Sequence, residues 1–169
     1  MEAGFSDYQR DKYTIERVIG SLVGVSGHTF DILYDLLFTT ERVIAVIIQH
    51  PTDIPYQFTA VWRTILFGNS LAIRREQLER QRIAQTRRQA LQERTLDELA
   101  AIHPMNFEIR YSAITSVEIM RRLFQSQLRF YVSGPSTKEQ IIRFTLPQKQ
   151  IPEAQRLLEL VLLSKTKGK

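Results

Sequence analysis

Two closely spaced aspartates and the three histidines are the first candidates in this sequence for catalysis or metal binding. Asp31 and Asp35 are four positions apart, so on a β-strand their side chains would share one face. No third group accompanies them, and we expect both to be solvated carboxylates. His28, His50 and His103 are far apart in the sequence and lack the close spacing of metal ligands. The sequence therefore predicts no metal site.

Cysteine is absent from the chain, which excludes disulfides, thiolate metal sites and cysteine nucleophiles. The sequence has no Walker loop, no glycine-rich dinucleotide turn and no G-x-S-x-G elbow. The closest glycine pair, Gly24 and Gly27, precedes no predicted helix whose amides could hold a phosphate. We therefore predict a protein that is not an enzyme and that carries no cofactor.

A segment in which aromatic residues are followed by arginines is the strongest candidate for a contact surface. Its candidate contact residues are Tyr56, Phe58, Trp62, Phe67, Arg74, Arg75, Arg80, Arg82, Arg87 and Arg88. Aromatic side chains suit the interface between water and lipid, and arginines bind anionic head groups. This favours a peripheral membrane or protein-scaffold adaptor. In the alternative, the aromatic residues pack on the domain and the arginines only keep a helix soluble.

The net charge of +5 is spread unevenly along the chain. Residues 70–94 contain seven arginines and three glutamates, a net charge of +4, whereas residues 1–49 are net acidic. Such asymmetry favours an acidic partner. Nucleic acid is the least favoured partner, because Glu76, Glu79 and Glu93 lie among the arginines and no base-reading motif is present.

Turn residues and runs of β-branched side chains predict two groups of strands. The predicted strands are 17–25, 29–39 and 42–49, followed later by 107–111, 114–120, 127–133 and 140–146. The run 42–49 is almost entirely Val and Ile, which favours a buried strand over a helix. A final helix is expected over 151–163, with Leu157, Leu158, Val161 and Leu162 on its apolar face.

One long helix is predicted between the two groups of strands. Residues 71–102 contain neither Gly nor Pro and consist mainly of strong helix formers. Few of them are apolar after Glu79, so we expect this helix to project from the domain or to meet a partner. Pairing with a second copy of the chain is an open alternative, although no regular heptad is present. Pro51 and Pro104 flank the segment, which predicts that it can be removed without unfolding the strands.

Three stretches resemble the bacterial and archaeal branch of the pleckstrin-homology superfamily. Residues 35–44 (DLLFTTERVI) are similar to its "strand, Thr, charged turn, Arg, Ile/Val" hairpin, and residues 109–119 (IRYSAITSVEI) to its "Ile-x-Tyr-x-x-Ile-x-x-Val" signature. Residues 144–163 are similar to its last strand and capping helix. The loop near Ser26, Gly27 and His28 has no Lys or Arg, unlike that of the members that bind phosphoinositides.

The resemblance implies a mainly β fold with some α. The implied architecture is a pleckstrin-homology-like, curved seven-stranded antiparallel barrel, capped by a C-terminal helix. The resemblance covers roughly residues 16–50 and 106–163. Over 51–105, where the family usually has a short connection, this sequence has a long helical insertion between the third and fourth strands. The expected organisation is an N-terminal lead-in (1–15), a domain made of 16–50 and 106–165, and an aromatic and basic helical insertion (51–105). In this fold Tyr111 and Ile114 should pack inward, and Thr40 and Glu41 should form a hairpin corner.

The sequence also suggests where the protein acts. No secretory signal is recognised near the start, and no apolar run reaches the length that crosses a membrane. We expect a cytoplasmic protein, with the inner face of the membrane as a candidate location. The expected partners are an anionic membrane surface or another protein, with a homo-oligomer as the alternative.

Overall fold

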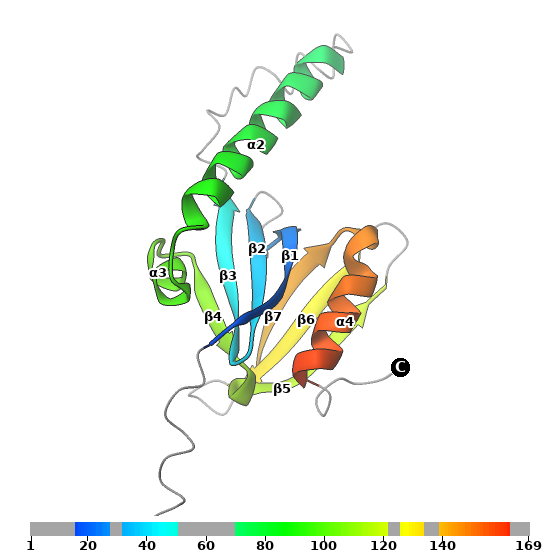
Figure 1. The fold of residues 1–169 in the computed structure, drawn as a ribbon. Coiled ribbons are helices and arrows are strands. Elements are labelled where there is room, and N and C mark those ends of the chain that lie inside the picture. The colour runs from blue at the N-terminus through cyan, green and yellow to red at the C-terminus, as the bar shows by residue number, and fades with distance from the viewer. Residues whose placement is uncertain (1–15, 28–31, 51–69, 122–125, 134–138, 163–169) are drawn as a thin grey trace, which may run out of the picture.

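Seven strands and three α-helices make up the part of the chain that the structure describes (Figure 1). The computed structural model describes residues 16–27, 32–50, 70–121, 126–133 and 139–162, but not the side chains of 70–77 and 80. The strands are β1 (Val18–Ser26), β2 (Leu33–Thr39), β3 (Arg42–Gln49), β4 (Phe107–Arg110), β5 (Ile114–Met120), β6 (Ser126–Ser133) and β7 (Glu139–Leu146). The α-helices are α2 (Ser70–Leu91), α3 (Leu96–Ala101) and α4 (Ile151–Leu162), and the 3₁₀ helices are η2 (Tyr111–Ala113) and η3 (Gln148–Gln150).

The strands form one antiparallel sheet in the order β4-β3-β2-β1-β7-β6-β5. This confirms the expected mainly β class with seven antiparallel strands. Strand β1 pairs with β2 along its length, but it pairs with β7 at only one position, where Ser26 lies opposite Thr145. The two halves of the sheet are therefore joined at one point and diverge from there, so that their inner faces enclose a common core.

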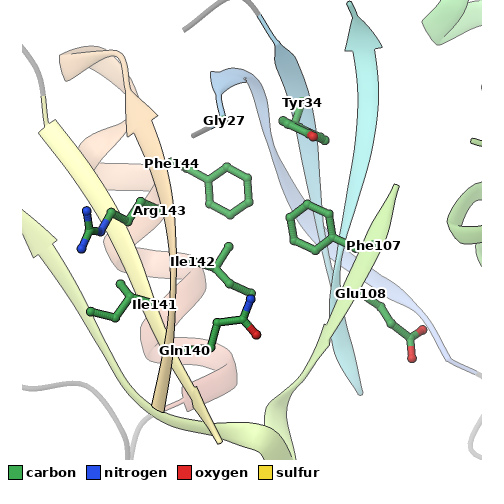
Figure 2. A pocket seen from close by; sticks show the side chains of 9 residues that line it. All are labelled: Gly27, Tyr34, Phe107, Glu108, Gln140, Ile141, Ile142, Arg143 and Phe144. Atoms are coloured by element: carbon green, nitrogen blue, oxygen red, sulfur yellow. The ribbon is translucent and has the colours of Figure 1, made fainter. Parts of the chain in front are cut away.

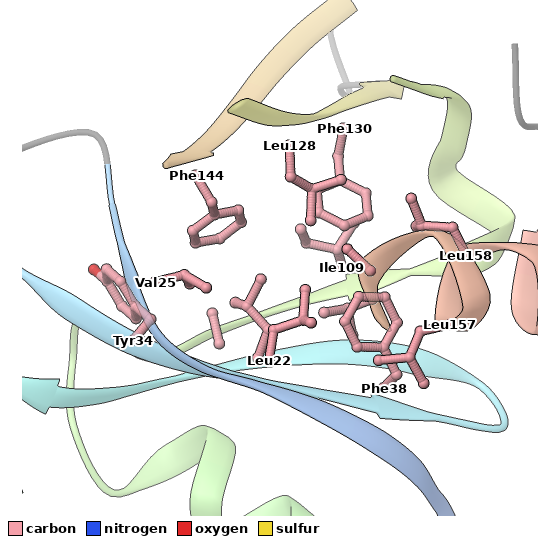
Figure 3. Close-up of a cluster of buried hydrophobic side chains, with 14 of the residues drawn as sticks. Leu22, Val25, Tyr34, Phe38, Ile109, Leu128, Phe130, Phe144, Leu157 and Leu158 are labelled. Carbon is pink, nitrogen blue, oxygen red and sulfur yellow. The ribbon is translucent and has the colours of Figure 1, made fainter. Parts of the chain in front are cut away.

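The core lies between the two halves of the sheet and α4 (Figure 3). Side chains alternate along β2, so Leu36 and Phe38 point inward, where Phe130 and Phe144 meet them from the other half. Helix α4 presents the predicted apolar face: Leu157, Leu158 and Leu162 are buried and Val161 packs on the core.

The hairpin corner and the Tyr111 segment are as expected. Thr40 and Glu41 form the bend between β2 and β3, where Thr39 Oγ1 accepts the N–H of Arg42 at 2.9 Å. Ile114 is buried in the core, and Tyr111 packs against its edge with its hydroxyl donating to the carbonyl of Thr39 at 2.8 Å. Burial raises the pKa of Tyr111 above its ordinary value, so this hydroxyl stays protonated and able to donate.

Strand β3 is covered on both faces. Val43, Ala45 and Ile47 belong to the main core, whereas Ile44 and Val46 belong to a second cluster with Ala84 of α2 and Leu99 of α3. Double coverage explains why β3 reads as a continuous β-branched run rather than an alternating one. The prediction of a buried strand at 42–49 is thus confirmed.

The prediction of one helix over 71–102 is wrong, because the chain turns between α2 and α3. Thr95 caps α3: its hydroxyl accepts the N–H of Glu98 at 3.3 Å, and the Glu98 carboxylate accepts the N–H of Thr95 at 2.8 Å. Reciprocal bonds of this kind start a new helix. The turn lets Leu99 pack on β3, which a straight continuation of α2 would carry away from the sheet.

Candidate functional site

Helix α2 is held on the sheet by an ion pair. Arg88 binds the carboxylate of Asp35 in β2 through two contacts, Nε to Oδ2 at 2.6 Å and Nη2 to Oδ1 at 2.8 Å. Asp35 Oδ1 also accepts the N–H of Gly24 in β1, at 2.7 Å. Gly24 has a φ of 64°, a left-handed conformation that favours glycine. The hydrogen bond with Asp35 raises the pKa of Arg88 above its ordinary value.

The expectation that Asp35 is a solvated strand carboxylate is wrong. Asp35 is only 8% exposed, and the Arg88 side chain of α2 supplies the compensating charge. A carboxylate is buried only where hydrogen bonds and an opposite charge replace its water. Asp31 lies outside the described residues, so the pairing of the two acids is not observed.

A second set of contacts fixes the same half of α2. Arg87 Nη1 donates to the carbonyl of Ile48 at 3.2 Å, and Ala84 and Leu91 pack on the outer face of β3. These residues recur every three or four positions, so they form one stripe along the helix. The C-terminal half of α2 is therefore attached to the sheet by charge, hydrogen bonding and apolar packing.

The other half of α2 extends beyond the sheet (Figure 1). Leu78 is 64% exposed, and Glu79, Gln81 and Arg82 are exposed as well. Leu78 and these polar residues therefore form a solvent-exposed surface of the helix. At a rise of about 1.5 Å per residue, the part of α2 before Ala84 is roughly 20 Å long.

The structure distributes the ten predicted contact residues over three groups. Tyr56, Phe58, Trp62 and Phe67 lie outside the described residues. Arg74, Arg75 and Arg80 lie on α2, with side chains that are not described, and Arg82 is exposed on the same helix. Arg87 and Arg88 are brought onto the sheet, where they bind groups of the chain itself.

A cluster around Arg42 was not anticipated from the sequence. The Arg42 side chain binds Glu16, with Nε to Oε1 at 3.0 Å and Nη2 to Oε2 at 2.8 Å, and it also binds Asp97 of α3 and Glu108 of β4. The hydrogen bond with Glu16 contributes most to raising the pKa of Arg42. Burial alone would raise the pKa of Glu108, but hydrogen bonds from Arg42 and Arg110 outweigh it and lower that pKa. The cluster attaches α3 to the β2–β3 corner. Its acidic residues are far from Arg42 in the sequence, so no local sequence pattern indicates it.

A cleft of about 590 Å³ lies between β7 and β4 (Figure 2). One wall is the five consecutive residues Gln140–Phe144, the other is Phe107 and Glu108, and Tyr34 and Gly27 complete the lining. The rings of Phe107 and Phe144 stack across it, with centroids 6.1 Å apart. A Cβ on Gly27 would lie 2.6 Å from the ring of Tyr34, so glycine lets that ring close the end of the cleft.

Among the described residues, no group of three or more His, Asp or Glu side chains is placed to hold a metal ion. His103 Nδ1 accepts the N–H of Met105 at 3.1 Å, a structural role at the start of the turn into β4, and His28 lies outside the described residues. No helix in the described ranges combines the length and the apolar character needed to cross a bilayer.

Comparison with protein-family models, with curated proteins and with solved structures gives no match to this chain.

Proposed function

We propose that the chain is a non-catalytic interaction domain of pleckstrin-homology-like architecture. Two features support the proposal. The strand order, with β4-β3-β2-β1 followed by β7-β6-β5 and a helix after β7, agrees with that architecture. The Thr40–Glu41 corner and the packing of Tyr111 and Ile114 on the core are compatible with it as well. In this proposal the long segment between β3 and β4 is an insertion into the domain.

We propose further that α2 carries a contact surface for an anionic membrane. The supporting observation is the unequal attachment of this helix: its C-terminal half is fixed by Arg88 and Asp35, while Leu78 and Arg82 in the other half are exposed. This attachment leaves the first half of α2, whose sequence carries Arg74, Arg75, Arg80 and Arg82, extending beyond the sheet (Figure 1). The aromatic residues before α2 and the arginines along it would then meet the lipid together. Acting in this way, the protein would work at the cytoplasmic face of a membrane.

Sedimentation with lipid vesicles tests this proposal. The full chain should sediment with vesicles containing phosphatidylserine at low salt, and less with pure phosphatidylcholine. High salt should reduce the difference, because head-group attraction is screened while aromatic insertion is not. Trp62→Ala should weaken binding to both kinds of vesicle. A protein that stays in the supernatant with anionic vesicles at low salt contradicts the proposal.

The exposed Leu78 favours a second candidate, a homo-oligomer formed through the projecting half of α2. An exposed leucine on a rigid helix can pack against its own copy. Sedimentation velocity over a range of protein concentrations distinguishes the candidates. Self-association is supported if the chain forms a dimer that the Leu78→Glu substitution dissociates. A chain that is monomeric at all concentrations excludes this candidate.

A further inference from the structure

Strand β7 has an edge that the described backbone leaves open. On one side β7 pairs with β6 from Glu139 to Leu146, but on the other it pairs with β1 only at Thr145. Strand β1 ends at Ser26, and the N–H of the following Gly27 donates to the carbonyl of Ile32 at 2.9 Å. Alternate residues of a strand direct their N–H and C=O groups to opposite sides. Within the described structure, residues 140–144 thus present backbone donors and acceptors to the cleft.

The side chains around this edge divide by face. Ile142 and Phe144 point into the cleft, toward Phe107 on β4 (Figure 2). The other face of β7 points outward and carries Ile141 and Arg143, which are exposed. A strand lying beside β7 would therefore find apolar neighbours on one face and a charged neighbour on the other.

Three charged residues lie in a row across the outward face, one on each of β5, β6 and β7. Glu118 on β5, Arg129 on β6 and Arg143 on β7 lie directly opposite one another across the three strands. Arg129 binds Glu118, with Nη1 to Oε1 at 3.3 Å, whereas Arg143 lies exposed beside the like charge of Arg129. Like charges directly opposite one another destabilise a sheet, and opposite charges stabilise it. The open position beyond Arg143 therefore suits a carboxylate.

We propose that the cleft binds an extended peptide segment of a partner protein, which adds as a strand beside β7. An acidic residue of the peptide lies next to Arg143, and the residues before and after it are apolar and pack on the partly buried Ile142 and Phe107. Backbone bonds to an open strand edge give affinity, and side-chain neighbours on the two faces give selectivity. The inference is independent of membrane contact by α2, since the two surfaces share no residue.

Labelled synthetic peptides test the inference by fluorescence anisotropy with the full chain. The probe is the capped peptide Ser-Thr-Val-Glu-Phe-Thr-Ser, compared with the same peptide carrying Lys in place of Glu. The Glu peptide should bind about tenfold more tightly than the Lys peptide. Arg143→Glu should reverse that order. Arg121→Glu, at an exposed arginine just after β5, should leave it unchanged.

Backbone methylation separates strand addition from binding of the side chains alone. One peptide is N-methylated at Glu and another at Val and Phe, because a strand uses only alternate amides toward its neighbour. One of the two should lose binding and the other keep it. Equal binding by both, an unchanged order with Arg143→Glu, or no binding by any peptide would overturn the inference.

Discussion

Arg88 of α2 forms a two-point ion pair with Asp35 of β2, at 2.6 and 2.8 Å, and this pair attaches the helix to the sheet. Asp35 is buried and Arg88 is half-exposed, so the pair lies at the boundary between the core and the solvent. The direction of α2, and with it the placement of the projecting half, depends on a contact between residues 53 positions apart.

Arg88→Ala should lower the free energy of unfolding by about 1–3 kcal/mol, since it leaves the Asp35 carboxylate buried without its partner. The matched control is Arg82→Ala on the same helix, where the side chain is exposed and a change within about 0.5 kcal/mol is expected. Urea denaturation measures both. Equal stabilities of the two variants would contradict the anchoring role of Arg88.

Gly20 of β1 lies directly under Leu157 of α4. A Cβ added at Gly20 would lie 2.6 Å from Leu157 Cδ2, so Gly20→Ala should destabilise the protein by about 1–3 kcal/mol. Leu157→Ala should cost about 2–5 kcal/mol, because Leu157 is fully buried. In the double variant the smaller side chain makes room for the added methyl group. A double-mutant cycle should then show less than additive loss, and strict additivity would contradict the contact.

Leu99→Ala should destabilise the protein by about 2–4 kcal/mol, because Leu99 is buried against the outer face of β3. Ile102→Ala, at the exposed end of α3, is the control and should change stability by less than about 0.5 kcal/mol. Thermal unfolding followed by circular dichroism compares them. If both variants melt like the parent, α3 does not cover β3 in solution.

Glu108 gives a pH dependence whose sign follows from its pKa. The folded-state pKa lies below the ordinary 4.5, so ionised Glu108 stabilises the fold above pH 4.5, and this contribution is lost as the pH falls through the folded-state pKa. Glu108→Gln should therefore be less stable than the parent at neutral pH and should approach it below pH 4.5. Glu159→Gln, at an exposed residue of α4, serves as the control. A stability difference that stays constant down to low pH would contradict the role of Glu108.

Sequence patterns predict the strands and α4 well, because alternating burial and turn residues are local signals. The break at Thr95 is also local: Thr95 and Glu98 have the spacing of a capping box, which the strong helix formers around them obscured. The Arg42 cluster and the Asp35–Arg88 pair join residues far apart in the chain, and no local pattern indicates them.

The structure changes the expected result of removing the segment between β3 and β4. Flanking prolines predict that residues 52–104 can be replaced by a short linker. Ile44, Val46 and Ile48 are nonetheless buried under α2 and α3, and this replacement would expose all three. We therefore expect the shortened protein to aggregate or to bind a hydrophobic dye, and a soluble, cooperatively folding product would contradict this.

The central claim is that α2 and the aromatic segment before it contact an anionic membrane, and a charge-matched pair of variants tests it most directly. One variant carries Arg74→Gln, Arg75→Gln, Arg80→Gln and Arg82→Gln. The other carries Arg17→Gln, Arg121→Gln, Arg143→Gln and Lys149→Gln, at exposed positions outside α2. Both lose four positive charges, so general attraction to the vesicle falls equally. Each arginine near the surface contributes on the order of 1 kcal/mol, so the α2 variant should bind phosphatidylserine vesicles at least tenfold more weakly than the control. Equal binding by the two variants would contradict the claim.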